Sequence, residues 1–171
     1  MLENTLSTKF RDTSQNKMNL LMAMLQNNDL RKWVYYLTEN PSGEPDIPIQ
    51  KVINEHFNLN KFSDDIQQMS KVILFIDPVE GIFRHNKPSA EEWAISIALP
   101  NEFWFIKETG KERVFEIAHR IALCIDDQRL AGIGKVLITS YKVYNINQRW
   151  TQLTLYVEVV NSNLPVPNGQ N

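Results

Sequence analysis

The sequence predicts an α+β protein in which one long helix packs on an antiparallel sheet of about four strands, preceded by amino-terminal helices. Two strands are predicted where apolar residues alternate with small or polar ones, at residues 91–99 and 150–160. Between them, apolar residues recur at helical spacing along one stripe, formed by Val114, Ile117, Ala118, Ile121 and Ile125. A helix with one apolar stripe and a sheet with one apolar face can bury each other in two layers.

Two further strands complete the predicted sheet. Residues 72–76 are a continuous apolar run that ends at Asp77-Pro78, which is typical of a short buried strand. A loop is expected from Gly81 to Pro88. Residues 135–144 follow Gly134 and end at a polar run, 145–149, which is expected to turn the chain into the last strand.

The long helix has recognisable start and stop signals. Thr109 and Glu112 have the spacing of a capping box, so the helix is expected to begin at Thr109. Asp126-Asp127 and Gly132 are expected to end it. Cys124 lies at the edge of the stripe and is interpreted as a packed core thiol.

The amino-terminal third is predicted to contain short helices joined by a proline-rich loop. Residues 1–14 are expected to form a flexible arm. A helix capped by Ser14 or Asn16 and a second helix capped by Asp29 should follow. Their apolar positions are Met18, Leu21, Met22 and Leu25 in the first, and Leu30, Trp33, Val34 and Leu37 in the second.

Three prolines within residues 41–48 disfavour regular structure, and Ile49, Val52, Ile53 and Phe57 suggest one or two helical turns. Residues 49–70 are otherwise the least readable part of the chain. A single domain over residues 15–161 and a disordered tail at 162–171 complete the predicted organisation.

The bulk properties are those of an ordinary globular domain. The chain has 171 residues, a formal net charge of −2 and one cysteine. The near-balance of charge gives no general attraction to nucleic acid or to an anionic membrane, and the amino-terminal residues lack the apolar segment of a signal peptide. One cysteine cannot form an intramolecular disulfide or a multi-cysteine zinc site.

A search for chemical motifs gives no candidate catalytic, cofactor-binding or metal-binding residues. His119 and Cys124 are five positions apart, so they point about 140° apart on a helix. The pairs Asp64-Asp65 and Asp126-Asp127 are adjacent and do not converge on one metal ion. The G-x-G of residues 132–134 precedes a strand, which is the wrong order for a phosphate-binding loop. The basic run at residues 84–87 is interpreted as a solvated loop rather than a nucleic-acid contact.

Aromatic residues give the strongest indication of a partner. Tyr141, Tyr144, Trp150 and Tyr156 are expected to leave aromatic surface on the second face of the sheet, and a lone monomer seldom exposes much of it. This pattern favours self-association.

A more specific pattern is the order of several short strings. These are EEWAISIALP (91–100), NEFWFI (101–106), ERVFEIAHRI (112–121), LAGIGK (130–135) and YVEVVN (156–161), with NDLRKWVYYLTENP (28–41) before them. Taken together, they resemble the tail-terminator, or tail-completion, neck proteins of tailed bacteriophages. The resemblance covers roughly residues 18–161, and residues 40–70 match nothing in it.

The resemblance implies a structural virion protein without catalytic residues. Such proteins form rings, typically hexameric, that cap the tail tube and join the tail to the head, after assembly in the host cytoplasm. The partners implied are further copies of the chain, the tail tube and the neck or connector proteins. Two aromatic clusters are candidate interface anchors: Phe103, Trp104 and Phe105, and the hairpin residues Tyr144, Asn145, Ile146 and Trp150. Ordinary core packing is the alternative interpretation of both clusters.

Two rival functions remain open from the sequence. The first is a small soluble ligand-binding module or enzyme with a site built on loops 77–90 and 40–48, where Asp77, Glu80, Arg84 and His85 would converge. The second is an adaptor that binds a peptide along an unpaired edge of the sheet.

Overall fold

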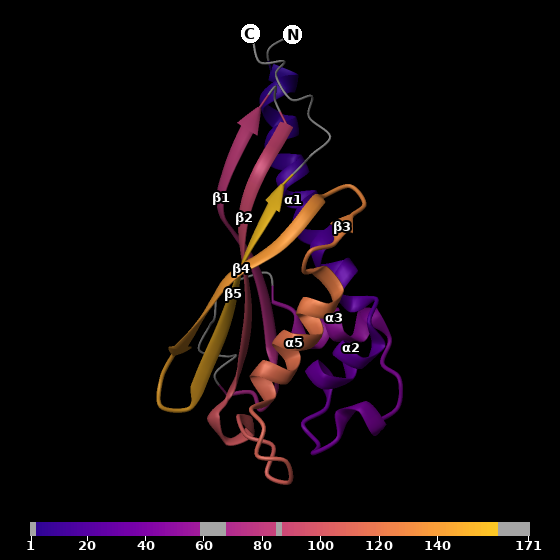
Figure 1. Cartoon of the computed structure of the whole chain (residues 1–171), viewed down its shortest axis with the longest axis vertical. Helices are drawn as coiled ribbons and strands as arrows, with labels where there is room; N and C mark the ends of the chain where they lie inside the picture. Colours follow the sequence, from indigo (N-terminus) through magenta and orange to yellow (C-terminus); the bar gives the residue numbers. More distant parts are fainter. Residues whose placement is uncertain (1–2, 59–67, 85–86, 161–171) are drawn as a thin grey trace.

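The computed structural model describes residues 3–58, 68–84 and 87–160 (Figure 1). The helices are α1 (Glu3–Leu25), α2 (Asn28–Tyr35), α3 (Ile49–His56) and α5 (Arg113–Ile125), with short 3₁₀ turns at Pro41–Gly43 and Asn101–Phe103. The strands are β1 (Ile73–Arg84), β2 (Lys87–Pro100), β3 (Arg129–Leu130), β4 (Gly134–Asn145) and β5 (Trp150–Val160).

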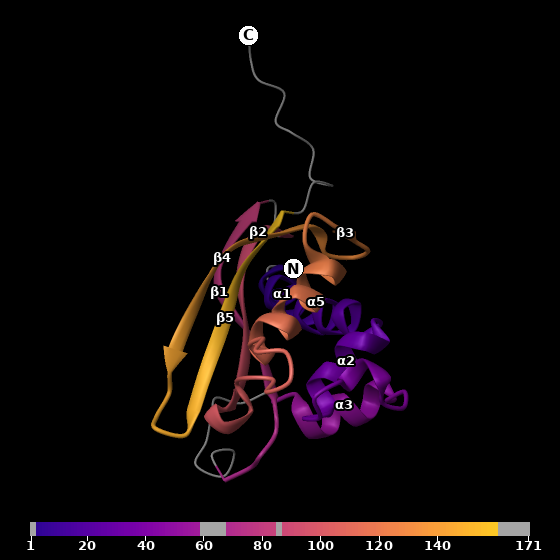
Figure 2. The same cartoon turned by 60° about the horizontal axis from the view of Figure 1, so that its bottom comes forward.

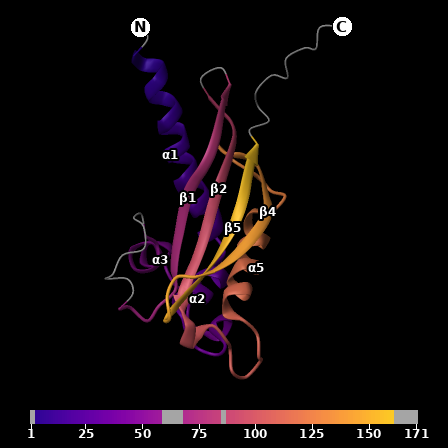
Figure 3. The same cartoon turned by 90° about the vertical axis from the view of Figure 1, so that its left-hand side faces the viewer.

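The strands form one antiparallel sheet in the order β1-β2-β5-β4-β3 (Figure 3). At the centre of the sheet, Ile95 on β2 lies opposite Ile76 on β1 and Leu155 on β5. Four long strands confirm the predicted α+β class, and β3 adds a two-residue fifth strand.

Figure 2 shows the helices on one face of the sheet, and the main core consists of side chains from these helices and from the sheet. The predicted stripe on α5 is buried against this face, together with the alternate residues of the central strands. Ile121 on α5 and Ile97 on β2 are both fully buried, as is Leu21 on α1. The periodicity that predicted these elements therefore reflects burial on one face.

Two predicted boundaries are wrong. The first helix begins at Glu3 rather than near Ser14, so it includes most of the expected arm. The long helix begins at Arg113, because residues 105 and 112 form a bridge that holds the preceding segment in a narrow loop. In that loop the Thr109 hydroxyl accepts a 3.4 Å hydrogen bond from the Lys111 backbone N–H instead of capping the helix.

The expected loop at residues 81–88 is also wrong in part. β1 continues past Pro78 to Arg84, and β2 begins at Lys87, so the two strands form a long hairpin beside α1 (Figure 1). A register shift between Pro78 and Glu80 accommodates the proline, which an edge strand tolerates because its N–H need not be donated. The predicted tail at 162–171 and the Asp64-Asp65 pair lie outside the described residues.

The second helix has the expected apolar residues but a different cap. The side chain of Asn27, rather than that of Asp29, accepts a 3.0 Å hydrogen bond from the Leu30 backbone N–H. Asp29 lies in the first turn, and its carboxylate instead bonds to α5 and to the proline-rich loop.

Candidate functional site: an apolar patch at the edge of β4

Four apolar side chains are exposed together where α5 meets β4. We call Phe105, Phe115, Tyr141 and Val143 the β4 patch; these residues are 57%, 38%, 59% and 41% exposed, respectively. Phe115 on α5 contacts Tyr141 on β4 edge to face, with ring centroids 5.7 Å apart. Tyr141 and Val143 are two residues apart on β4, so they point to the same face of the strand.

A hollow of about 350 Å³ opens at one end of the patch. It is lined by Phe105 and Val143 of the patch, by Trp104 and by the polar residues Asn101, Asn145 and Thr151. The wall therefore combines apolar surface with amide and hydroxyl groups. Such a surface suits a protein segment that buries apolar side chains and offers backbone hydrogen bonds.

Asn101 fixes the hollow by joining the 3₁₀ turn to the β4–β5 hairpin. Its backbone N–H donates to the Arg149 carbonyl at 2.8 Å, and its side-chain amide donates to the Gln148 carbonyl at 3.0 Å. Its side-chain oxygen accepts from the Thr151 hydroxyl at 2.6 Å. The positions of Phe105 and Val143 relative to each other are therefore set by hydrogen bonds as well as by packing.

Arg113 fixes the other side of the patch from inside the protein. Its side chain is only 2% exposed. It donates to the carbonyls of Phe103 at 3.3 Å and of Thr38 at 2.8 Å, and also to those of Tyr36 and Leu37. The Arg113 backbone N–H donates to the Trp104 carbonyl at 2.7 Å. Burial lowers the pKa of this guanidinium, and the charge of Glu39 opposes that shift.

The hollow brings together residues from both predicted aromatic clusters. Trp104 and Phe105 come from the first cluster, and Asn145 comes from the second. Phe103 and Trp104 are half-buried and pack against the main core. Tyr144 is half-buried on the other face of β4, where its hydroxyl lies 2.8 Å from that of Tyr156.

The prediction that Trp150 is an exposed interface residue is wrong, because Trp150 is fully buried. It belongs to a small second cluster with Ile73, Phe75 and Ala98, and the half-buried Ile146 packs against this cluster. The expected aromatic face of Tyr141, Tyr144, Trp150 and Tyr156 is therefore divided among an exposed patch, a half-buried tyrosine pair and a core residue.

Sequence reasoning missed Phe115 and Val143 as exposed members of the patch. Phe115 directly follows Val114 of the buried stripe on α5 but is itself exposed. Val143 alternates like any strand residue. Neither position carries a sequence signal that separates an exposed apolar residue from a buried one.

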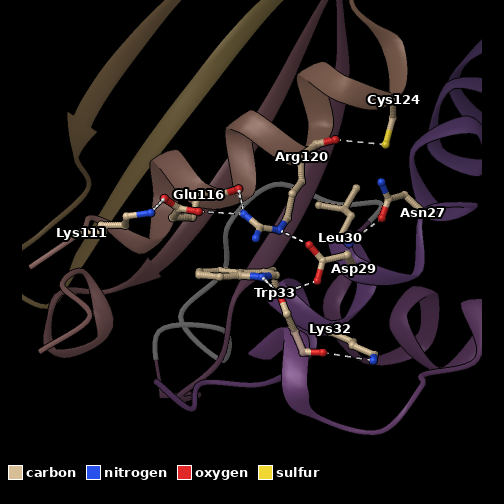
Figure 4. A network of polar contacts seen from close by, with 10 residues as sticks. Asn27, Asp29, Leu30, Lys32, Trp33, Lys111, Glu116, Arg120 and Cys124 are labelled. Carbon is tan, nitrogen blue, oxygen red and sulfur yellow. Dashed lines mark hydrogen bonds and ion pairs between the residues drawn. The ribbon is translucent and has the colours of Figure 1, made fainter. Parts of the chain in front are cut away.

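A separate polar network joins α2 to α5 (Figure 4). Arg120 donates to Asp29 at 2.6 Å and to Glu116 at 2.9 Å, and its guanidinium lies 4.0 Å from the centre of the Trp33 ring. The Ser42 hydroxyl donates to Asp29 at 2.6 Å and accepts from the Trp33 indole N–H at 2.9 Å. Every charged group in this joint has a partner, so its geometry is that of a structural contact.

The carboxylates of this network are held ionised. Burial acts to raise the pKa of Asp29, but hydrogen bonds from Ser42 and Arg120 and the charges of Arg120 and Lys32 outweigh burial and lower it. A hydrogen bond from Arg120 is the main cause that lowers the pKa of Glu116. Neither carboxylate is placed to accept a proton near neutral pH.

The remaining candidate groups do not form a reactive site. The Cys124 thiol donates to the Arg120 carbonyl at 3.0 Å, and burial raises its pKa, so it is poorly disposed to form a thiolate. His119 is exposed, whereas His56 is buried. Among the residues that the structure describes, no three histidine, cysteine or acidic side chains are placed to hold a metal ion.

Three carboxylates form a row across the opposite face of the sheet. Glu80, Glu92 and Glu158 lie directly opposite one another on β1, β2 and β5. They line an open hollow of about 330 Å³ together with Ile82, Ala90 and Thr139. Like charges facing each other across strands are unfavourable, so this acidic row has a cost in stability.

The described parts of the two loops of the rival site do not come together. Residues 40–48 lie against α2, where Asp46 pairs with Lys32 at 3.1 Å, at the end of the molecule away from the β1–β2 hairpin (Figure 1). Asp77 lies on the hairpin and pairs with Lys17 at 3.9 Å. His85 and the side chain of Arg84 lie outside the described residues.

Comparison with known protein families gives a match. The family model of YomW matches residues 27–159, which is most of the chain. The protein belongs to the YomW family. YomW is the name of a phage-derived, SPβ-like protein, which is consistent with a phage origin. A search of the curated proteins found no match.

The region shared with the YomW family runs from the cap of α2 almost to the end of β5. It contains all four residues of the β4 patch, the network around Arg120 and the buried Arg113. Most of α1 precedes it. In the part of the chain that the structure describes, no helix is long and apolar enough to cross a membrane.

Proposed function

We propose that this YomW-family protein is a structural component of a phage neck or tail end, and that its copies form a ring that caps the tail tube and joins tail to head. The observation that carries the proposal is the β4 patch, because four large apolar side chains stay exposed beside the edge of a sheet. A phage-derived family and the resemblance to tail-terminator proteins support the same role.

The site is suited to assembly in three physical respects. Phe105, Phe115 and Tyr141 supply aromatic area, which buries much surface at a low cost in side-chain entropy. Hydrogen bonds donated by Arg113 to the Phe103 carbonyl and accepted by Asn101 from the Thr151 hydroxyl hold the patch in place before a partner binds. A closed ring requires contacts between two different surfaces of each copy, which a patch on one edge permits.

The proposal is tested by the mass of the purified protein in light scattering, alone and after mixing with phage particles that lack it. A mass of several copies, or uptake into those particles, is expected. Val143→Lys should reduce both, because a lysine on the patch would have to be buried. Leu123→Lys is the matched control, since Leu123 is 64% exposed on α5 outside the patch. A wild-type protein that stays monomeric and never joins a particle would contradict the proposal.

A further inference from the structure

We propose that residues 163–167 of a neighbouring copy bind along the outer edge of β4 as an added strand, with two of their side chains on the β4 patch. This inference rests on the proposed function, because it names the contact through which copies in the ring would join. Three features carry it: the edge of β4, which no described strand covers beyond β3, the apolar surface beside that edge, and the pattern of the segment.

The edge of β4 is available over residues 140–144. β3 pairs only with Gly134 and Lys135. Val136 and Ile138 donate their N–H groups to the Gln128 carbonyl and to the Asp126 carboxylate, respectively. Among the described residues, no strand pairs with β4 beyond this point on the side away from β5. An exposed strand edge is a template for adding a strand from another chain.

The opposite edge of the sheet is poorly suited to the same contact. β1 carries Pro78, which has no N–H to donate, and an irregular register between Pro78 and Glu80. Asp77 and Glu80 add negative charge there. Proline, irregular register and charge are the features by which natural proteins protect a sheet edge from pairing. A strand is therefore expected to add at β4.

The surface beside the β4 edge selects the kind of strand. Side chains of an extended segment alternate between its two faces, so residues i and i+2 would fall on the side of Tyr141 and Val143. Phe115 and Phe105 flank that side, and the hollow of about 350 Å³ lies beside it. The fitting segment has apolar residues at i and i+2.

The chain itself contains such a segment, Asn163-Leu164-Pro165-Val166-Pro167. Leu164 and Val166 are apolar at i and i+2. Alternate residues of a strand direct their N–H groups to opposite edges, so Leu164 and Val166 can donate towards β4. The two prolines then fall on the far edge, where their lack of an N–H opposes the addition of another strand. Residues 161–171 carry no charged side chain that would be buried on the patch.

The segment that binds at the β4 edge must come from a neighbouring copy, because a copy's own segment is too short to reach its own patch. Val160 pairs with Lys135, whereas Leu153 pairs with Val143, so the patch lies seven residues back along β5. Seven strand residues span about 23 Å, and crossing β4 adds about 10 Å sideways. Residues 161–166 can extend at most about 21 Å. The copy's own Val166 therefore falls short of Val143.

Disulfide trapping tests this contact in the full chain with Cys124→Ser as background. One variant carries Val143→Cys and the other carries Val166→Cys, and the two are mixed under mild oxidation. The mixture should give at least ten times more mixed dimer than the matched control pair, Leu123→Cys with Asn171→Cys. A chain with both cysteines should form a ladder of covalent oligomers. Equal yields in test and control pairs, or closure within one chain, would overturn the inference.

A second variant separates this inference from the proposed function. Leu164→Asp with Val166→Asp should abolish the mass above monomer and the uptake into particles, whereas Ser162→Asp with Asn168→Asp should retain both. If the first variant still assembles normally, the contact is wrong and the ring proposal stands. If the wild-type protein neither assembles nor enters particles, both are wrong.

Discussion

Arg113 is an unusual residue because its guanidinium is buried and its hydrogen bonds go to backbone carbonyls. It joins the start of α5 to residues 36–38 after α2 and to Phe103 before the patch. Helix ends leave carbonyls without partners, and those near the end of α2 are satisfied here by one side chain. The structure therefore depends on a single residue to seal this junction.

Replacing Arg113 with methionine should lower the free energy of unfolding by about 2–4 kcal/mol, because buried carbonyls would lose their donors. Urea denaturation followed by tryptophan fluorescence measures the change. The control is Arg149→Met, at an exposed position, which should change stability by less than about 0.5 kcal/mol. Equal effects of the two substitutions would show that the buried hydrogen bonds are unimportant.

His56 provides a prediction of pH dependence. Burial lowers its pKa, and the hydrogen bond between its Nδ1 and the Val72 carbonyl, 2.8 Å long, opposes that shift only in part. Below the ordinary pKa of 6.5, the unfolded chain binds a proton that the folded protein does not. His56 therefore favours folding above about pH 6.5, and this contribution is lost as the pH falls towards its lowered folded pKa.

The free energy of unfolding should accordingly decrease between pH 7 and pH 5 more steeply in the wild-type protein than in His56→Gln. Urea denaturation at several pH values gives both slopes. His119→Gln is the control, since His119 is exposed, and it should retain the wild-type slope. A slope that is unchanged by His56→Gln would contradict the assignment of the pH dependence to this buried ring.

Among the secondary-structure elements, the acidic row across β1, β2 and β5 lowers the stability of the sheet, because its like charges repel one another. Glu92 lies between Glu80 and Glu158 and faces both. Glu92→Gln should therefore raise the free energy of unfolding by about 0.2–1 kcal/mol. The gain should shrink in high salt, because salt screens exposed charges. Urea denaturation at low and high salt measures both effects.

Glu102→Gln is the control for this substitution, because Glu102 is an exposed carboxylate on the turn at Asn101–Phe103, outside the row. It should leave stability nearly unchanged at both salt concentrations. A loss of stability in Glu92→Gln would mean that the row holds a favourable interaction rather than a repulsion.

Sequence periodicity predicted those elements whose burial on one face sets their pattern. The apolar stripe of α5 and the alternate apolar residues of β2 and β5 are the residues that form the main core. The β1–β2 hairpin was not predicted, because Pro78 and Gly81 are loop signals in isolation and are tolerated here on an edge strand. Residues 3–14 lack a clear apolar stripe, so the early start of α1 left no signal in the sequence.

The sequence predicted that the candidate site is an aromatic interface, but it predicted only some of the residues that form it. Aromatic residues near residues 103–105 and 141–150 indicated an interface, and the structure brings Trp104, Phe105 and Asn145 to one hollow. The sequence alone does not reveal that Trp150 turns into a second small cluster while Phe115 turns outward. Which of these two aromatic residues is buried depends on the register of β5 and on the rotation of α5 about its axis. Tertiary packing determines both.

For the whole molecule, the fold places the described helices on one face of the sheet, with β4 near one side of the sheet (Figures 2 and 3). The β4 patch is exposed beside this strand. Burying that patch against a neighbour would complete its packing. A closed ring follows when each copy offers the patch on one side and receives a neighbour's segment on it.

Cryo-electron microscopy of phage particles that contain this protein tests the central claim most directly. We expect a closed ring of its copies at the neck or tail end, with Tyr141 and Val143 of each copy covered by its neighbour. Particles in which the protein lies away from the neck and the tail end, or in which its copies stand apart with the β4 patch exposed to solvent, would contradict this proposal.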